Sequence, residues 1–385
     1  MGCSCLLKAY QTECTNEKEN KEEKDNANIV DIENNVNNDN NNDYSPSNFA
    51  NNMNNQNQNN TTSQSNVIVN NNLQNKNLLQ LGTCQMVNKR AKSNPTYPQV
   101  NTKDNVESSN DVFENRQEDK MLITQEEFQE FISTLEPLKD SVEVEVRPST
   151  ECENKAVYYG EWDIKNNKRH GRGIQVWEDG SKYLGFWKND KACGKGKLIH
   201  QDGDIYDGDW ESDKPNGKGY YVHSDGTKYT GEWKNDKQDG KGEEVWPDGS
   251  TYVGEYKEGK KQGYGVFKWV DGNVYEGNFD NNIINGKGKY TFTDKRVYEG
   301  DWVNNKIEGK GIFTWPDGRI YEGEFKNDKR DGIGEYKTAD GKIFKGEWKD
   351  GKQNGEGKIY IPKDNKWKKG IWANGKRVKW INDDN

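Results

Sequence analysis

A strict 23-residue repeat dominates the second part of the chain. An aromatic residue recurs at this interval at Tyr183, Tyr206, Tyr229, Tyr252, Tyr275, Tyr298, Tyr321 and Phe344. In every repeat a glycine follows two residues later, a second aromatic residue four residues later, and a Gly-x-Gly pair after that. An Asp-Gly dipeptide usually ends the repeat. Periodicity this strict predicts a stacked array in which each repeat is one supersecondary motif.

Each repeat is predicted to fold as a β-hairpin. The two aromatic residues and the glycine between them lie at i, i+2 and i+4, so in a strand they share one face. Asp-Gly favours a tight turn because glycine readily adopts positive φ, and the glycine density excludes helices. The expected fold class is an all-β repeat array, an elongated, twisted antiparallel sheet of consecutive hairpins. The array is expected over residues 151–380, with nine full repeats from Tyr158 and a partial tenth near 369–372.

Stacked rings are expected to replace an aliphatic core in this array. Only 30% of the residues are hydrophobic and 31% are charged, a poor composition for a large aliphatic core. A glycine beside each ring lets the ring lie flat over the backbone, and aromatic neighbours contribute about 0.5–1.5 kcal/mol beyond burial. The acidic residues after the glycines, such as Asp209 and Glu232, recur about every 10 Å in this geometry. They are therefore predicted to form a solvated ladder beside lysines.

The first 150 residues differ in composition from the array. They contain no Trp, and their 13 Lys and Arg against 23 Asp and Glu give a net charge of −10, whereas residues 151–385 carry +1. Neither part has the basic field that nucleic-acid binding needs, so no nucleic-acid partner is expected. Residues 16–120 are Asn-rich and cannot bury enough apolar surface to offset ordering, so a disordered linker is predicted. No apolar run is long enough for a transmembrane helix, and six scattered cysteines favour a reducing, intracellular setting.

A short helix and a strand are predicted over residues 121–150, where they would cap the array. Thr124 as N-cap and Glu127 three residues later fit a capping box. The helix is expected to run to about Glu136, because proline follows. Alternating valines over 142–146 predict a half-buried strand.

Residues 1–15 are predicted to form an acylated membrane anchor. After removal of the initiator methionine, Gly2 presents an amine that can be myristoylated, and Cys3 and Cys5 are candidate palmitoylation sites. One myristoyl chain binds membranes only marginally, so palmitate would supply the second signal. Leu6 departs from the Ser or Thr preferred at that position. The alternative is an ordinary disordered start that happens to contain Gly and Cys.

No residue set stands out as catalytic. His200 and His223 occupy a column otherwise held by Trp and Phe, which favours a packing role. Cys193 and His200 are the residue types of a nucleophile–base pair, but nothing in the sequence indicates a third, orienting residue. The run 286–289 lacks the Gly-Lys-Ser/Thr ending of a phosphate loop. We therefore expect a protein that is not an enzyme, with no catalytic residue, no metal and no cofactor.

The pattern Tyr-x-Gly-Glu-Trp-x6-Gly-x-Gly, followed by Asp-Gly, resembles the MORN repeat (membrane occupation and recognition nexus). Residues 229–242 are close to a consensus copy, and the resemblance covers about residues 158–372. Local departures include Phe186 and Asn278 at the acidic position and Lys295 in place of the glycine of Asp-Gly. The resemblance implies a scaffold of membrane-junction, ciliary or cortical cytoskeletal type, at the cytoplasmic face of a plasma or ciliary membrane or at the cell cortex, or otherwise in the cytoplasm.

The function expected is a non-enzymatic, membrane-tethered scaffold that binds protein partners through the array, with self-association through a terminal repeat as a further option. The candidate partner-binding residues form the aromatic face: Tyr206, Trp210, Tyr229, Trp233, Tyr252, Tyr256, Tyr275, Phe279, Tyr298 and Trp302. The alternative is that these rings pack on one another and on the capping helix. A further alternative, implied by the resemblance, is a phosphoinositide-binding module or a regulatory subunit of a lipid-signalling enzyme. Its candidate headgroup residues lie in Lys-rich turns: Lys188, Lys234, Lys257 and Lys326.

Overall fold

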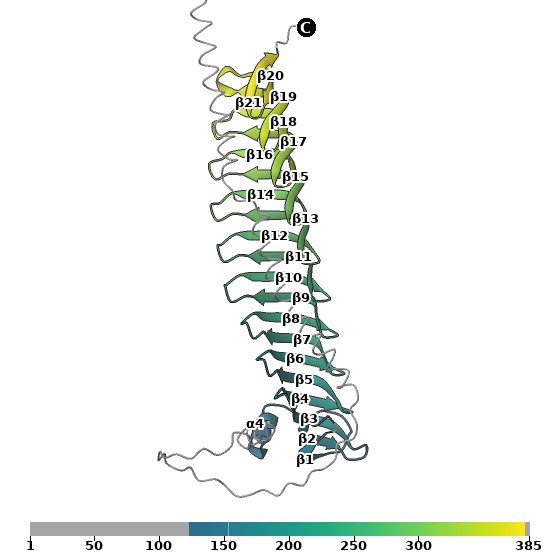
Figure 1. Ribbon diagram of the computed structural model, residues 1–385. Helices are drawn as coiled ribbons and strands as arrows, with labels where there is room; N and C mark the ends of the chain where they lie inside the picture. Colours follow the sequence, from purple (N-terminus) through teal and green to yellow (C-terminus); the bar gives the residue numbers. More distant parts are fainter. Residues whose placement is uncertain (1–122, 153, 382–385) are drawn as a thin grey trace, which may run out of the picture. The chain divides into compact units, whose positions relative to one another are not determined.

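The computed structural model describes residues 123–152 and 154–381, which divide into two compact units at Gln262/Gly263 (Figure 1). The predicted acyl anchor with Gly2, Cys3 and Cys5, and the predicted linker over 16–120, lie outside the described residues. The first compact unit contains α4 (Gln125–Ser133), β1 (Val144–Glu151), β2 (Val157–Asp163), β3 (Lys168–Val176), β4 (Lys182–Lys188), β5 (Lys191–Ile199), β6 (Ile205–Glu211), β7 (Lys214–Val222), β8 (Lys228–Lys234), β9 (Lys237–Val245) and β10 (Thr251–Lys257).

The second compact unit begins within β11. Its elements are β11 (Lys260–Lys268), β12 (Val274–Asp280), β13 (Ile283–Thr291), β14 (Val297–Val303), β15 (Lys306–Thr314), β16 (Ile320–Lys326), β17 (Lys329–Lys337), β18 (Ile343–Lys349), β19 (Lys352–Ile361), the 3₁₀ turn η1 (Pro362–Asp364), β20 (Lys366–Ala373) and β21 (Lys376–Ile381). Within each compact unit, every strand pairs antiparallel with the next strand in the chain. The predicted fold class, a twisted antiparallel sheet of consecutive hairpins, is confirmed.

Each tyrosine of the repeat lies flat over a pair of glycines on neighbouring strands. Gly277 faces Gly288 across β12 and β13, and a Cβ on either glycine would collide with the Tyr275 ring. The Tyr275 hydroxyl donates to the backbone oxygen of Asn278 at 3.0 Å. The register of β12 and β13 shifts at this place, so the hydroxyl supplies a hydrogen bond where the ladder is interrupted. The same bond, at 2.9–3.1 Å, recurs in seven other repeats.

Within each compact unit, the rings form a series of edge-to-face contacts on one side of the sheet, here called the inner face. Tyr298 contacts Trp302 of its own repeat at 5.4 Å and Phe325 of the next repeat at 5.2 Å, with interplanar angles of 81°. The Trp302 indole also donates to the Gly288 oxygen of the preceding hairpin at 3.2 Å. Rings and indole bonds therefore join each repeat to its neighbour, and the predicted aromatic core is confirmed within both compact units.

A second set of hydrogen bonds joins the hairpin turns of successive repeats. Asp213 N–H donates to the Ala192 oxygen at 3.0 Å, and the Asp213 carboxylate accepts from Ala192 N–H at 2.7 Å. Residues 21 apart make the same backbone bond further along, as in Asp328 to Ile307. The turn residues Asp213 and Asp328 have φ of 68° and 65°, a conformation that Asp and Asn tolerate better than most residues.

The helix α4 packs against the opposite side of the sheet, the outer face, at β2 and β3. Thr124 caps it as predicted, accepting from Glu127 N–H at 3.1 Å. The helix ends at Ser133 and not near Glu136, because the side chains of Ser133 and Thr134 bond back to backbone oxygens of the last turn. Strand β1 extends the predicted 142–146 segment to Glu151, and its first valines are exposed and not half-buried.

Candidate functional site

A shallow groove of about 1100 Å³ runs over the outer face of the second compact unit. Its floor is the paired glycine backbone, on the side away from the tyrosine rings: Gly277, Gly288, Gly300, Gly311, Gly323, Gly334 and Gly346. Both walls carry charges of the two signs, because lysines and glutamates lie opposite one another on neighbouring strands. The lysines are Lys287, Lys289, Lys310 and Lys345, and the glutamates are Glu276, Glu299, Glu322, Glu324 and Glu335. The absence of side chains along the floor leaves the backbone accessible between the two charged rows.

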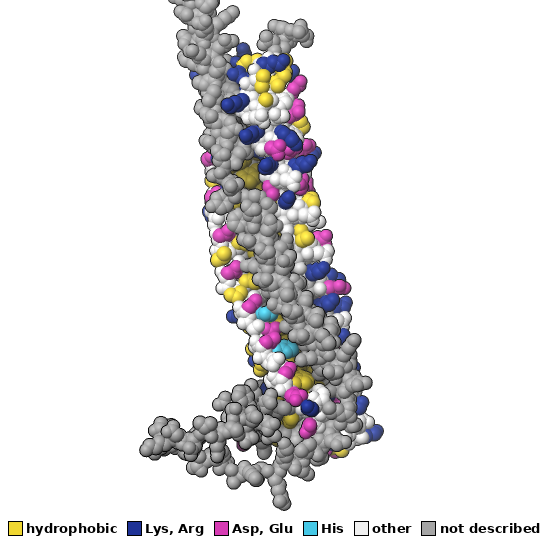
Figure 2. Space-filling view, in the orientation of Figure 1, with side chains coloured by type: hydrophobic (Ala, Val, Ile, Leu, Met, Phe, Trp, Pro, Cys, Tyr) yellow, Lys and Arg dark blue, Asp and Glu magenta, His cyan; other side chains and the backbone are white. Residues whose placement is uncertain are grey.

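Three apolar side chains interrupt the charged walls of this groove. Tyr264, Ile312 and Ile333 are 55%, 42% and 61% exposed, although all three are large and hydrophobic. Charges of both signs are interspersed on the face seen in Figure 2. The groove itself is lined by four lysines and five glutamates, so it has no single-signed field. An apolar surface rimmed by charge is typical of a site that binds a protein segment.

The acidic column beside the glycines fixes the backbone and is more than a solvated ladder. The Asp301 carboxylate accepts from Lys310 N–H at 3.0 Å and pairs with Lys287 at 2.5 Å. Burial raises the pKa of Asp301, but these hydrogen bonds more than compensate and hold the pKa below its ordinary value. Gly309, which precedes Lys310, has φ of 65°, and a Cβ there would press on Asp301. The lysine neighbours were predicted, but the sequence reasoning missed the backbone role.

The predicted partner-binding rings lie in the interior of the array. Nine of the ten are at most 8% exposed: Tyr206, Trp210, Tyr229, Tyr252, Tyr256, Tyr275, Phe279, Tyr298 and Trp302. Trp233 is half-buried. Buried side chains lie opposite some of them on the neighbouring strand, as Ile284 does for Phe279 and Ile307 for Trp302. The rings therefore pack on one another, as the alternative expects, but not on the capping helix, because α4 lies on the opposite face of the sheet. A partner-binding role for the rings stays a prediction.

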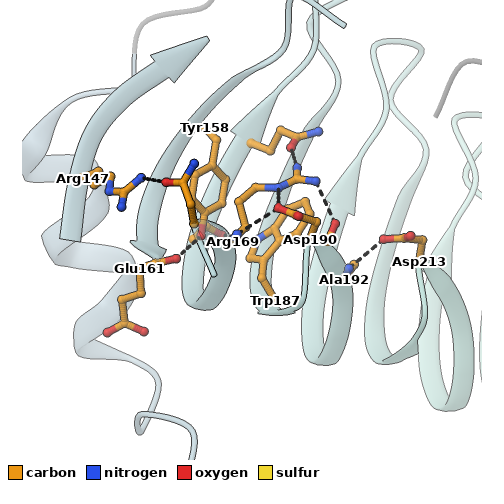
Figure 3. Close-up of polar contacts among 11 residues, drawn as sticks. Arg147, Tyr158, Glu161, Arg169, Trp187, Asp190, Ala192 and Asp213 are labelled. Carbon is orange, nitrogen blue, oxygen red and sulfur yellow. Dashed lines mark hydrogen bonds and ion pairs between the residues drawn. The ribbon is translucent and has the colours of Figure 1, made fainter. Parts of the chain in front are cut away.

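Buried cations on the inner face are a feature that the sequence reasoning missed. The Arg169 guanidinium is 2% exposed, lies 4.3 Å above the Trp187 ring and pairs with Asp190 (Figure 3). Burial lowers the pKa of Arg169, against the charge of Asp190. Arg330 lies 4.7 Å above Trp348 at the equivalent position of a later repeat. The only sequence signal for these cations is that they recur at the same repeat position, the second residue of the second strand in a hairpin. Their place above aromatic rings indicates that they pack in the core through cation–π contacts.

The outer face holds α4 through apolar and polar contacts together. Phe128 is fully buried, with its ring 4.7 Å from that of Tyr159, and it packs with Ile174. Arg172 donates to the Leu135 oxygen at the end of the helix at 3.0 Å, and Lys182 pairs with Glu127. A helical segment is therefore accommodated directly on this face.

The histidine and cysteine positions do not assemble a catalytic set. Cys193 and His200 lie seven residues apart along an extended segment, roughly 23 Å at strand spacing. Burial raises the pKa of the Cys193 thiol, which opposes a nucleophilic thiolate. His170 is buried and bonds to Asp140 at 2.8 Å, and this bond lowers the pKa of Asp140. Within residues 123–152 and 154–381, no three His, Cys, Asp or Glu residues are grouped for a metal ion.

Other predicted positions take structural places. The glycine–lysine run 286–289 lies inside strand β13, as an ordinary part of a hairpin. Lys257 is 3.6 Å from Asp239, whereas Lys188, Lys234 and Lys326 are exposed at strand ends. None of the helices in the described part of the chain has the length and apolarity required to cross a bilayer.

Solved structures provide two comparisons. The TCP10 domain of Danio rerio CPAP is similar over 54% of this chain and 98% of its own length, with 11% identity and a TM-score of 0.33. The TCP domain of Drosophila melanogaster SAS-4 (dCPAP), in complex with a proline-rich motif of Ana2 (dSTIL), matches over 40% and 84%, with 13% identity and a TM-score of 0.27. Scores this low carry no argument about function. No curated protein matches this chain.

The repeats themselves match a family description. The MORN repeat matches nine consecutive segments: 158–182, 183–205, 206–228, 229–251, 252–274, 275–295, 298–318, 321–343 and 344–366. These segments cover more than half of the sequence and coincide with the hairpins described above. The chain therefore belongs to the MORN repeat family.

Proposed function

We propose that this protein is a non-enzymatic scaffold, tethered to a membrane through acyl chains on its N-terminal residues, that binds a segment of a partner protein in the outer-face groove of its second compact unit. MORN repeats are compatible with a non-enzymatic, protein-binding or membrane-associated scaffold. The groove, with its glycine floor and exposed apolar residues, is the observation that carries the proposal.

The geometry of the groove favours a helical occupant. Two strands at about 4.8 Å advance roughly 10 Å per repeat, and seven residues of an α-helix advance roughly 10.5 Å. A helix lying across the strands would therefore present one heptad to each repeat. The seat of α4 on the outer face of the first compact unit supports this mode, since Phe128 enters there between apolar residues of neighbouring strands.

The charge pattern of the groove favours a protein segment over a lipid headgroup as occupant. Its four lysines are matched by five glutamates on the walls. An anionic headgroup would gain little long-range attraction from such a balance. A partner helix with apolar residues at heptad spacing and mixed charges on its flanks would match both components.

The groove is tested by affinity capture of partners with Tyr264→Ser/Ile333→Ser. Both side chains are exposed, so the fold is expected to persist, whereas loss of two apolar anchors is expected to weaken binding by about tenfold or more. The matched control is Val253→Ser/Val270→Ser, because these valines are 51% and 68% exposed and do not line the groove. Equal recovery of the same partners by both variants would place binding elsewhere.

A further inference from the structure

Two strands of the array have only one neighbour each within the described sheet. Strand β1 pairs with β2 alone, and β21 pairs with β20 alone. A strand with one neighbour presents a row of backbone donors and acceptors along its other side, which can pair with a further strand. Both strands also expose apolar side chains: Val144 and Val146 are 37% and 50% exposed, and Val378 and Ile381 are 63% and 36% exposed.

These two strands belong to regions of opposite charge. Residues 366–381, which form β20 and β21, contain six Lys and Arg and no Asp or Glu, a net charge of +6. Residues 123–151, which contain α4 and β1, hold eight acidic and two basic residues, a net charge of −6. Charge repulsion therefore disfavours pairing of β1 with a second β1 or of β21 with a second β21. Charge attraction favours pairing of β1 with β21.

We propose that β21 of one copy of this chain pairs antiparallel with β1 of a second copy. Placing Val144 opposite Ile381 continues both faces of the sheet, because Val144 and Ile381 each lie on the outer face. Glu145 then lies opposite Trp380 on the inner face, and Val146 lies opposite Lys379 on the outer face. The contact uses two different surfaces, so each pair retains one unused β1 and one unused β21, and assembly continues beyond a dimer.

The test measures the mass of the full chain by light scattering over a wide range of protein concentration, at low and at high salt. The monomer mass is 44.3 kDa. The expected result is a mass that grows with concentration, passes twice the monomer value and falls when salt screens the charges. Glu143→Lys/Glu145→Lys changes the net charge of residues 143–151 from −2 to +2, and Lys376→Glu/Lys379→Glu changes that of β21 from +3 to −1. Each variant is expected to remain monomeric, because like charges then lie on the two segments that would pair.

Combining all four substitutions in one chain reverses the sign of the charge on both segments and is expected to restore assembly. Restored assembly would show that the two double variants had lost the contact and not the fold. Asp207→Lys/Glu243→Lys is the matched control: both residues are exposed on other strands, neither lines the groove, and the change in net charge equals that of Glu143→Lys/Glu145→Lys. A mass that stays at the monomer value, as a contact within one chain would give, overturns the proposal. Assembly that stops at a dimer, or that the charge reversals leave unchanged, also overturns it. A parallel measurement adds anionic vesicles: if the protein binds them through β20 and β21 but shows no gain in mass without them, the proposal is likewise overturned.

Discussion

The break in each hairpin ladder is held by side chains that bond to backbone. At the register shift beside Gly300, the Tyr298 hydroxyl and the Asp301 carboxylate each satisfy a backbone group that the strands cannot pair. The aromatic and glycine columns were predictable because a period of two places them on one face. The role of Asp301 was not, because alternation along a strand carries no mark of where a bulge will fall.

One position in the Asp-Gly turns carries local strain. Seven repeats place glycine there with φ between 85° and 98°, but Lys295 occupies it with φ of 72°. A left-handed conformation costs a residue with a side chain about 1–2 kcal/mol, partly offset by the greater unfolded-state entropy of glycine. We expect Lys295→Gly to raise the free energy of unfolding by about 0.5–1 kcal/mol in urea titrations. The reciprocal Gly318→Lys is expected to lower it, and equal stability of all three proteins would contradict this account.

Asp236 lacks a hydrogen bond that its counterparts make. In other turns the Asp or Asn side chain accepts from the backbone N–H of the residue 21 positions earlier, as Asn305 does from Ile284 at 2.8 Å. For Asp236 that residue is Pro215, which has no N–H. Burial then raises the pKa of Asp236 to about 6, against the nearby charges of Lys214 and Lys237.

This raised pKa makes a pH-dependent prediction. The folded state favours protonated Asp236, so its contribution to stability is fully present below the unfolded pKa near 4 and is lost as pH rises through about 6. Asp236→Asn removes the charge, and Asn305 shows that asparagine fits this turn. We expect the variant to be more stable than the parent by about 1–2 kcal/mol at pH 7 and equal to it at pH 4. Urea unfolding at both pH values measures this, and the same difference at both would refute it.

At the scale of elements, the hairpins were predictable from the sequence, but the docking of α4 on the outer face of the sheet was not. The Tyr-x-Gly and Asp-Gly spacing defined every hairpin, and the capping box at Thr124 located the start of α4. The site where α4 docks was indicated in the sequence only by Tyr159, Ile174 and Leu184, apolar residues at two repeat positions that are more often polar than apolar in later repeats. Tyr264 and Ile333 marked the groove in the same manner, since they replace lysine between two glycines. Which face they project from follows from the register of the strands.

The docking of α4 depends on Phe128. A nine-residue helix is marginal without tertiary support, and truncating a fully buried phenylalanine costs about 3–5 kcal/mol. We expect Phe128→Ala to abolish the hydrogen-exchange protection of residues 125–133 while leaving protection of β6 to β9 unchanged, because repeats contact only their neighbours. Gln129→Ala, an exposed position on the same helix, is the control. Loss of protection throughout the array in Phe128→Ala would show that α4 supports the whole fold.

At the scale of the whole molecule, net charge concealed the arrangement of charge. The near-neutral +1 of residues 151–385 argued against long-range attraction to anionic partners, yet residues 366–381 carry +6. The burial of the aromatic face could not be derived from periodicity, because a period of two tells which residues share a face but not what covers it. Ile284 and Ile307, which lie opposite two of these rings, come from strands that pair through a bulge whose position the sequence does not mark.

The proposed tether makes a prediction for the entire chain. With Gly2→Ala the α-amine can no longer carry a myristoyl chain. We expect the share of protein in the membrane fraction of cells to fall several-fold, since one remaining type of acyl signal holds membranes weakly. Cys3→Ser/Cys5→Ser is expected to cause a similar loss, and Ser4→Ala is the control. Undiminished membrane association of Gly2→Ala would contradict the acyl tether and leave the groove proposal standing.

The bonds between turns of successive repeats, such as Asp213 to Ala192, have a consequence for inheritance. Every such bond joins adjacent repeats only, so the contacts of one hairpin do not depend on the number of repeats in the chain. Duplication or excision of one complete repeat would leave each remaining neighbour pair chemically the same, whereas loss of a single residue within a strand would send alternate side chains to the wrong side. Copy number is therefore the property that descent can change most easily in this gene.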